Sequence, residues 1–316
     1  MKALRIVFMG TPEFAVGILD AIIKQNIHTI VGVVTVADKP AGRGQKIKYS
    51  AVKEYALLNN LPLLQPISLK DDDFLNDLKA WNANLNVIVA FRMLPKLVWN
   101  LPELGTFNLH ASLLPNYRGA APINWAIING ETQTGVTTFF IDEKIDTGAI
   151  ILAKNIAIEP IETAGSLHDK LMLLGCDAVL ETLDLITIEK ARTSIQPELP
   201  NIKTAYKLNK ENCKIDFSKN INEIYNLVRG LSPYPSAWCD FKDGEQIWQV
   251  KIYEVVAEVQ NHDLKIGTII TTKKELKIAV LNGFLIIESL QLPGKKRMTI
   301  REVLNGIKFS ENAHAF

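Results

Sequence analysis

The sequence has few cysteines and lacks the long hydrophobic runs that mark membrane proteins. Its 316 residues contain three cysteines, Cys176, Cys213 and Cys239, spaced too widely for a disulfide framework or a paired-cysteine metal site. This usage predicts a reducing, cytoplasmic setting. The longest apolar runs, residues 4–9 and 30–36, are too short to cross a bilayer, and the first residues lack a signal-peptide pattern. We therefore expect no membrane partner.

The chain also lacks a strong charge imbalance, internal repeats and low-complexity tracts. Its 35 basic and 34 acidic residues leave a net charge of +1, which argues against a protein that binds polyanions over its whole surface. The length is sufficient for a large core and makes two domains the natural expectation.

Short apolar strands alternate with helices in the first part of the sequence. Strands are expected at residues 4–9, 28–36 and 85–91, with helices at about 12–26 and 50–59. This alternation predicts an α/β fold with a doubly wound, mostly parallel sheet. Further strands at 135–141 and 149–158, then a long helix at about 166–188, complete a first domain over residues 1–189.

The rest of the chain has a different pattern. Residues 190–206 contain two prolines and no clear period, which predicts a linker. Short strands then recur through residues 207–316, a pattern typical of a small, OB-like β-barrel.

Polar side chains interrupt the apolar strand that ends in "FNLH". Asn108 and His110 are two residues apart, so strand alternation places them on one face. Asp146 lies just before Gly148 on a later connection, and functional groups gather where strands of an open α/β sheet end. We expect Asn108, His110 and Asp146 to share one site. The alternative is structural, with Asp146 in an Asx turn and His110 satisfied in the core.

Three other sites are disfavoured by missing motifs. The Gly10 turn lacks G-x-G-x-x-G because Pro12 stands where the second glycine should be, so no nicotinamide cofactor is expected. A hydrolase triad of Ser112, His110 and Asp146 has no G-x-S-x-G elbow to present the serine. No second His or Cys lies near the cluster at a spacing suited to zinc.

The stretch "NLHASLLPNYRGAAPI", followed by "IDTG", resembles the signature of the 10-formyltetrahydrofolate-dependent formyltransferases. The resemblance implies that 10-formyltetrahydrofolate is the co-substrate, that no metal is needed, and that Asn108, His110 and Asp146 are catalytic. It leaves open whether Asp146 accepts a proton or orients His110. It also implies a folate pocket lined by Ser112, Leu113, Leu114 and Pro115.

Other segments resemble the branch of this family that acts on charged initiator tRNA. They are the basic loop at 34–53 and the stretches "KLNKENCKIDFS", "PYPSAW" and "LQLPGKKRM". The resemblance implies formyl transfer to the α-amine of methionine on initiator methionyl-tRNA, in support of translation initiation. We expect the protein to be a monomer, although the sequence itself does not determine the oligomeric state. The implied tRNA-binding residues are cations suited to phosphate: Lys39, Arg43, Lys46, Lys48, Lys295, Lys296 and Arg297.

Two alternatives remain open at this point. A sugar-nucleotide N-formyltransferase would use a smaller acceptor and would not need the basic loop. A non-catalytic tRNA-binding relative would retain the fold without the reaction. The sequence departs from the family at one place, because Arg92 follows Phe91 where the family usually has glycine, in a segment that helps to wall the pteridine pocket.

Overall fold

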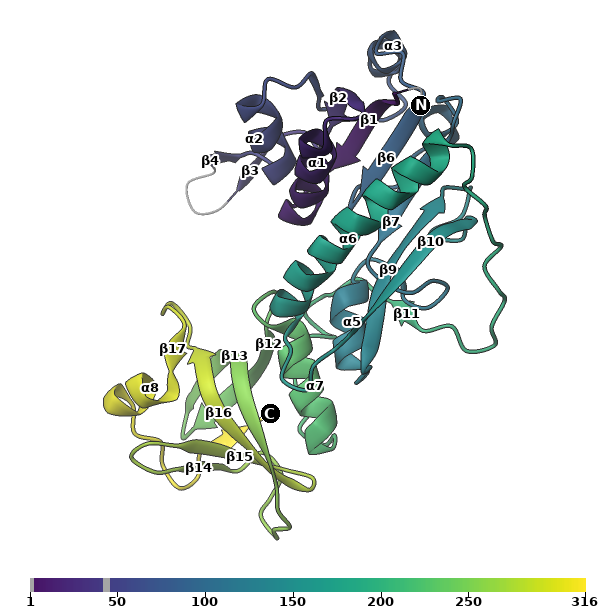
Figure 1. Ribbon diagram of the computed structural model, residues 1–316. Coiled ribbons are helices and arrows are strands. Elements are labelled where there is room, and N and C mark those ends of the chain that lie inside the picture. Colours follow the sequence, from purple (N-terminus) through teal and green to yellow (C-terminus); the bar gives the residue numbers. More distant parts are fainter. Residues whose placement is uncertain (1–2, 42–45) are drawn as a thin grey trace. The chain divides into compact units, whose positions relative to one another are not determined.

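The structure is a computed structural model that describes residues 3–41 and 46–316 (Figure 1). The chain forms two compact units that a single cut in the sequence does not separate. Unit 1 holds residues up to 119 with 134–156 and 168–204, and unit 2 holds 120–133, 157–167 and 205–316. The expected domains, residues 1–189 and 207–316, stay a prediction about segments that fold independently.

Unit 1 is built on a seven-stranded sheet in the order β10-β9-β7-β6-β1-β2-β5. The five strands from β5 to β7 run parallel, and β9 is antiparallel to β7. The mostly parallel sheet is therefore confirmed. Its strands are β1 (Arg5–Gly10), β2 (Thr29–Val34), β5 (Leu63–Leu64), β6 (Leu85–Val89), β7 (Thr106–His110), β9 (Gln133–Phe140) and β10 (Ile150–Ala157).

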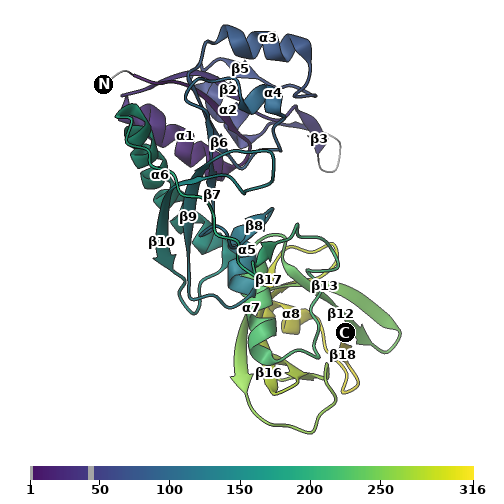
Figure 2. The same cartoon turned by 90° about the vertical axis from the view of Figure 1, so that its right-hand side faces the viewer.

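Helices cover both faces of this sheet, as a doubly wound fold requires. On one face α1 (Glu13–Gln25) lies beside α6 (Ala164–Thr187), and the Cys176 thiol donates to the Gly17 carbonyl (Figures 1 and 2). On the other face α3 (Asp72–Ala80) and α4 (Lys96–Trp99) bury apolar side chains against Val7 and Ile88. The helix α2 (Ala51–Leu58) begins at a Ser50 cap.

The basic loop contains a short two-stranded ribbon that the sequence did not predict. It is formed by β3 (Lys39–Ala41) and β4 (Lys46–Lys48), paired antiparallel. Three residues in each strand are too few to show a period-two pattern, and the glycines and proline nearby are typical of loops.

Unit 2 contains the expected small β-barrel. Its sheet has the order β14-β15-β16-β13-β12-β18, with β17 paired to β16. The Ile269 amide donates to the Ala313 carbonyl and the Ala315 amide to Gly267, so the two ends of the sheet meet. The strands are β12 (Ala237–Asp243), β13 (Gln246–Val259), β14 (Ile269–Thr271), β15 (Leu276–Val280), β16 (Gly283–Gln291), β17 (Met298–Thr299) and β18 (His314–Ala315).

Three helices lie wholly within unit 2. The helix α7 (Ile221–Leu231) starts with a capping box at Asn220 and packs its apolar side into the barrel core. Against it lies α5 (Pro122–Ile128), whose Asn124 amide donates to the Gly230 carbonyl over 2.8 Å. The third is α8 (Ile300–Gly306). Two-residue strands, β8 (Arg118–Gly119) and β11 (Thr204–Ala205), mark where the chain passes between units.

Candidate active site

His110 is buried at the end of β7 with one ring nitrogen committed to the backbone. Its Nε2 lies 2.7 Å from the Tyr117 carbonyl oxygen. A carbonyl only accepts hydrogen bonds, so Nε2 carries the proton and donates. Asn108 lies two residues back on the same strand face and is half-buried. In the part of the chain that the structure describes, its side-chain amide has no hydrogen-bond partner. The alternation that the sequence predicts is therefore present at both positions.

Asp146 lies beside the other ring nitrogen. Its Oδ2 is 3.8 Å from His110 Nδ1 and accepts a hydrogen bond from the Gly119 amide over 2.9 Å. Gly119 has φ of +119° and Asp146 has φ of +54°, in the left-handed region that is rare for a residue with a side chain. The carboxylate is thus held by the backbone at a fixed place next to the imidazole.

The Asx turn at Asp146 and the hydrolase triad do not fit this geometry, whereas a buried His110 bonded to the Tyr117 carbonyl also matches a histidine satisfied in the core. The Asx-type bond in this turn is made by Asp142, whose carboxylate accepts from the Lys144 amide. Ser112 donates its hydroxyl to the Asn116 carbonyl over 2.7 Å, so it does not form a triad with His110.

The segment expected to line the folate pocket is packed tightly into unit 1. Ser112, Leu114 and Pro115 are buried, and Leu113 is half-buried. Thr137 on β9 donates its hydroxyl to the Ser112 carbonyl and accepts from the Leu114 amide. The predicted contacts of all four residues with folate stay a prediction, and the structure offers Leu113 as the most accessible side chain of the four.

Gln196 is a residue of this site that the sequence analysis missed. Its side chain is buried, and its Nε2 donates to the carbonyls of Asp146 (2.9 Å) and Gly148 (2.8 Å). Its Oε1 accepts from Nε and Nη2 of Arg118 over 3.1 and 2.6 Å. The amide therefore ties the Asp146 turn to the loop after His110. Gln196 lies in the segment expected to be a linker, and this part of the segment belongs to unit 1. Ser194 of the same segment forms an antiparallel bridge with Ile150.

Arg92, the departure from the family pattern, is tied to a neighbouring loop. Its Nη1 donates to the Ile67 carbonyl over 2.9 Å and its Nη2 to the Pro66 carbonyl over 2.5 Å. Its Nε is buried without a partner among the residues described. The longer side chain thus fastens the loop after β5 to the end of β6.

The β3–β4 ribbon brings two lysine side chains close together among the residues that the structure describes. Lys39 and Lys48 are exposed and lie directly opposite each other across the two strands. The neighbouring acid, Asp38, is paired with Lys53 and accepts from Gln65, and these two hydrogen bonds lower its pKa. Lys46 lies on β4, and Arg43 falls outside the described residues, so both stay predictions from the sequence.

The basic run in unit 2 is uneven. Lys295 and Lys296 are exposed, whereas Arg297 pairs with Glu254 over 2.6 Å and donates to the Ser289 hydroxyl. The Arg297 charge is therefore partly neutralised, and the predicted phosphate contacts rest mainly on the two lysines.

Two kinds of feature are absent from the described part of the chain. No group of three or more His, Cys, Asp and Glu side chains is placed to hold a metal ion there. No helix within residues 3–41 and 46–316 combines the length and apolar character needed to span a membrane.

Comparison with known proteins agrees with this fold. A family model described as formyl transferase matches residues 4–183, and one described as formyl transferase, C-terminal domain matches 207–308. The chain belongs to the formyl transferase family.

Its relatives include full-length matches. A methionyl-tRNA formyltransferase of Flavobacterium psychrophilum is 71% identical over 316 residues, covering 100% of both chains. One of Bacteroides thetaiotaomicron is 50% identical, covering 98% of this chain and 97% of its own. A crystal structure of the sugar 3N-formyltransferase WlaRD shares the fold, with a TM-score of 0.64 at 22% identity over 94% of this chain and 100% of that one.

Proposed function

We propose that the protein transfers the formyl group of 10-formyltetrahydrofolate to the α-amine of methionine on charged initiator tRNA. One observation carries this proposal. A protein named methionyl-tRNA formyltransferase is similar to this chain over its whole length, which includes both regions matched by the family models. Such a reaction would support translation initiation and would take place in the cytoplasm.

The proposed chemistry follows from the two nitrogens of His110. Because Nε2 donates to the Tyr117 carbonyl, the Nδ1 edge is the one available to the reacting groups, and it faces Asp146 at 3.8 Å. In neutral His110 this Nδ1 carries a lone pair and can take a proton from the amine nitrogen once that nitrogen has bonded to the formyl carbon. In protonated His110 it carries a proton and can donate to an oxyanion or return the proton.

The reaction itself moves one proton and one formyl group. The neutral amine nitrogen attacks the formyl carbon, and the carbonyl electrons move to oxygen. The Asn108 amide supplies an N–H to that oxyanion, a donor typically worth about 3 kcal/mol in the transition state. The carbon–N10 bond then breaks as N10 takes up the proton that the amine gave to His110. Asp146 stabilises the protonated ring and orients it.

The β3–β4 ribbon supports the choice of acceptor. Like charges directly opposite each other on paired strands are destabilising unless an anion neutralises them. Lys39 and Lys48 have this arrangement, and a phosphate backbone would remove the repulsion. A dTDP-linked amino sugar would offer a single diphosphate, whereas a tRNA offers a phosphate at every nucleotide.

The proposal is tested by offering the purified chain 10-formyltetrahydrofolate with initiator methionyl-tRNA, uncharged initiator tRNA, or a dTDP-linked amino sugar. We expect formylation of the charged tRNA alone, because only it offers both a free α-amine and a phosphate backbone. Formylation of the amino sugar in preference to the tRNA would overturn the proposal. Binding of tRNA without formyl transfer would point to the non-catalytic alternative.

A further inference from the structure

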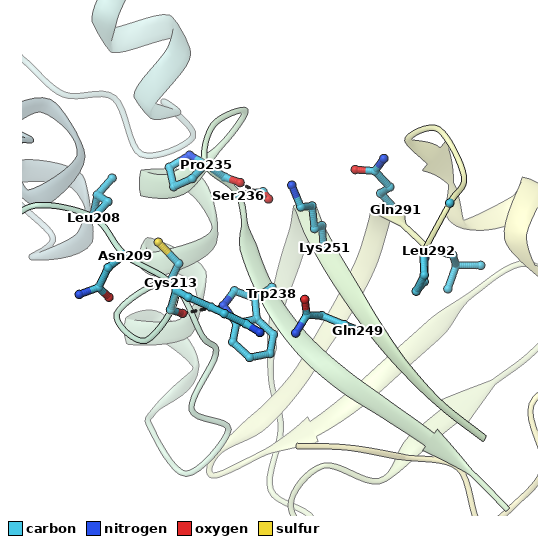
Figure 3. Close-up of a pocket in the computed structure, with 13 residues that line it drawn as sticks. Leu208, Asn209, Cys213, Pro235, Ser236, Trp238, Gln249, Lys251, Gln291 and Leu292 are labelled. Atoms are coloured by element: carbon cyan, nitrogen blue, oxygen red, sulfur yellow. Dashed lines mark hydrogen bonds between the residues drawn. The ribbon is translucent and has the colours of Figure 1, made fainter. Parts of the chain in front are cut away.

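Unit 2 has a cavity of about 550 Å³ on the outside of the barrel, lined by residues of unit 2 (Figure 3). It lies between the chain at 208–213, the start of β12, and the strands β13 and β16. None of the 13 lining residues is acidic, and two, Lys210 and Lys251, are lysines. A cavity of this size and sign suits an anionic ligand of nucleotide dimensions.

The strand register explains how its floor is assembled. Trp238 on β12 lies opposite Lys251 on β13, and Lys251 lies opposite Gln291 on β16. Residues paired across a sheet share a face, so an indole, an ammonium and an amide form one row across three strands. Their strand neighbours Cys239 and Val250 point the other way, into the barrel core. Figure 3 shows Trp238, Gln249 and Lys251 side by side on this outer face.

The polar groups of the cavity differ in whether they already have hydrogen-bond partners. Gln291 is fixed, because it donates to the Lys295 carbonyl and accepts from the Tyr253 hydroxyl. Lys251 and Gln249 are exposed, and within the described residues neither side chain has a hydrogen-bond or ion-pair partner. Both are therefore available to a ligand without breaking an existing contact.

The Trp238 ring in the floor of the cavity lies close to two lysine ammonium groups. The ammonium groups of Lys210 and Lys214 each lie 5.0 Å from the centre of the Trp238 ring, whose N–H donates to the Lys210 carbonyl. Lys214 is neutralised by Asp240, whereas Lys210 is exposed and joins Lys251 at the cavity. The apolar walls, formed by Leu208, Pro235 and Leu292, complete a site with an apolar surface and two cations at its edge.

We propose that this cavity holds one nucleotide of the RNA acceptor, with a phosphate between Lys210 and Lys251 and the base against the apolar wall beside Gln249. This inference rests on the proposed function, since it assumes an RNA substrate. The chemistry of an anion attached to a flat, hydrogen-bonding ring matches the cations, the amide and the apolar wall.

The test compares two variants of the full chain that change charge equally. Lys251→Glu alters the cavity, and Lys273→Glu alters an exposed lysine in the turn between β14 and β15. Affinity for uncharged initiator tRNA is measured over a salt series. We expect Lys251→Glu to weaken binding about tenfold and to flatten the log–log salt slope by about one unit, with little change for Lys273→Glu. Equal effects of the two variants would overturn the proposal.

A third variant tests whether the cavity is entered. Gln249→Trp fills the cavity without changing charge, so we expect several-fold weaker tRNA binding with the salt slope unchanged. Unchanged affinity would mean that the cavity stays empty and would overturn the proposal. Tight binding of free 5′-AMP or 5′-UMP at this cavity, with no competition from tRNA, would also overturn it by identifying a free nucleotide as the ligand.

These outcomes are separable from failure of the proposed function. If the wild-type chain formylates methionyl-tRNA while Lys251→Glu and Lys273→Glu behave alike, the cavity inference alone fails. If the wild-type chain formylates an amino sugar instead, the proposed function fails whatever the variants do. Unchanged affinity for formyl-folate in all three variants serves as the check that unit 1 is intact.

Discussion

At His110 the two ring nitrogens have different surroundings, and this difference defines the roles we propose. Nε2 is fixed by the Tyr117 carbonyl, and Nδ1 faces Asp146 across 3.8 Å. The distance is longer than a hydrogen bond, so the carboxylate does not occupy Nδ1, and this nitrogen is free to bond an incoming group.

We therefore expect His110→Ala to lower kcat about 100- to 1,000-fold, the cost typical of losing one group that acts in the transition state. Affinity for formyl-folate should change little. Steady-state kinetics and isothermal titration with formyl-folate measure the two effects. His110→Gln keeps an amide that can donate to the Tyr117 carbonyl, so it guards against a folding defect.

His168→Ala is the matched control, because His168 lies on α6 and pairs with its neighbour Asp169. It should leave kcat unchanged. A loss of formyl-folate affinity in His110→Ala with kcat preserved would make His110 a binding residue instead.

Gln196 acts at the same scale but through Asp146. Replacing it with leucine removes two donors from the Asp146 turn and one acceptor from Arg118 while keeping the volume similar. We expect Gln196→Leu to lower kcat by up to about 100-fold, because small misplacements of catalytic groups have effects of this size. Formyl-folate affinity and the pH at which activity is half-maximal are measured alongside kcat.

A purely structural role for Gln196 would lower thermal stability without moving the pH profile. Gln133→Leu, at the exposed start of β9, controls for the loss of a glutamine. An unchanged kcat and pH profile in Gln196→Leu would show that the Asp146 turn keeps its conformation without the Gln196 side chain.

At the level of elements, the positive charge of the β3–β4 ribbon is not neutralised by Asp38, because Asp38 pairs with Lys53. We expect Lys48→Ala to weaken binding of initiator tRNA and to flatten its salt slope by about one unit, as for one lost phosphate contact. Formyl-folate affinity should stay unchanged. Fluorescence anisotropy over a salt series gives both quantities.

Lys70→Ala serves as control for this prediction, since Lys70 is exposed in the chain before α3. If Lys48→Ala and Lys70→Ala have the same salt slope, the ribbon is only solvated surface, and a smaller acceptor becomes the better proposal.

At the level of the whole molecule, one thiol lies in unit 1 and two lie in unit 2, and all three have a raised pKa. Burial raises the pKa of Cys176 to about 11 and also raises the pKa values of Cys213 and Cys239 above the ordinary range for a thiol. Since the thiolate is the reactive form, at pH 8 only about one Cys176 in 1,000 is ionised.

We therefore expect a thiol reagent such as DTNB to react very slowly with the native chain at pH 8 and to react with all three cysteines after unfolding in urea. For Cys176 the native rate should rise with pH up to about 11, because the thiolate population grows below the pKa and saturates above it. Fast modification of the folded chain at pH 8 would contradict this.

The local sequence was sufficient for the parts of the protein that depend on periodicity. Apolar periods predicted the mostly parallel sheet, the long helix α6 and the strands of the barrel, because burial of one face imposes those periods on the sequence. The alternation at Asn108 and His110 predicted their shared face for the same reason. The family resemblance of "NLHASLLPNYRGAAPI" then supplied what periodicity could not, namely the chemistry expected of those side chains.

Only the tertiary structure decided where distant and aperiodic residues meet. Gln196 reaches Asp146 across 50 positions, and nothing in its own proline-containing segment marks it, because its bonds depend on where the Asp146 turn lies in space. Likewise, the row of Trp238, Lys251 and Gln291 depends on the register of three strands, which hydrogen bonds between strands fix. A sequence determines which faces are apolar, whereas the packing of those faces determines which polar side chains become neighbours.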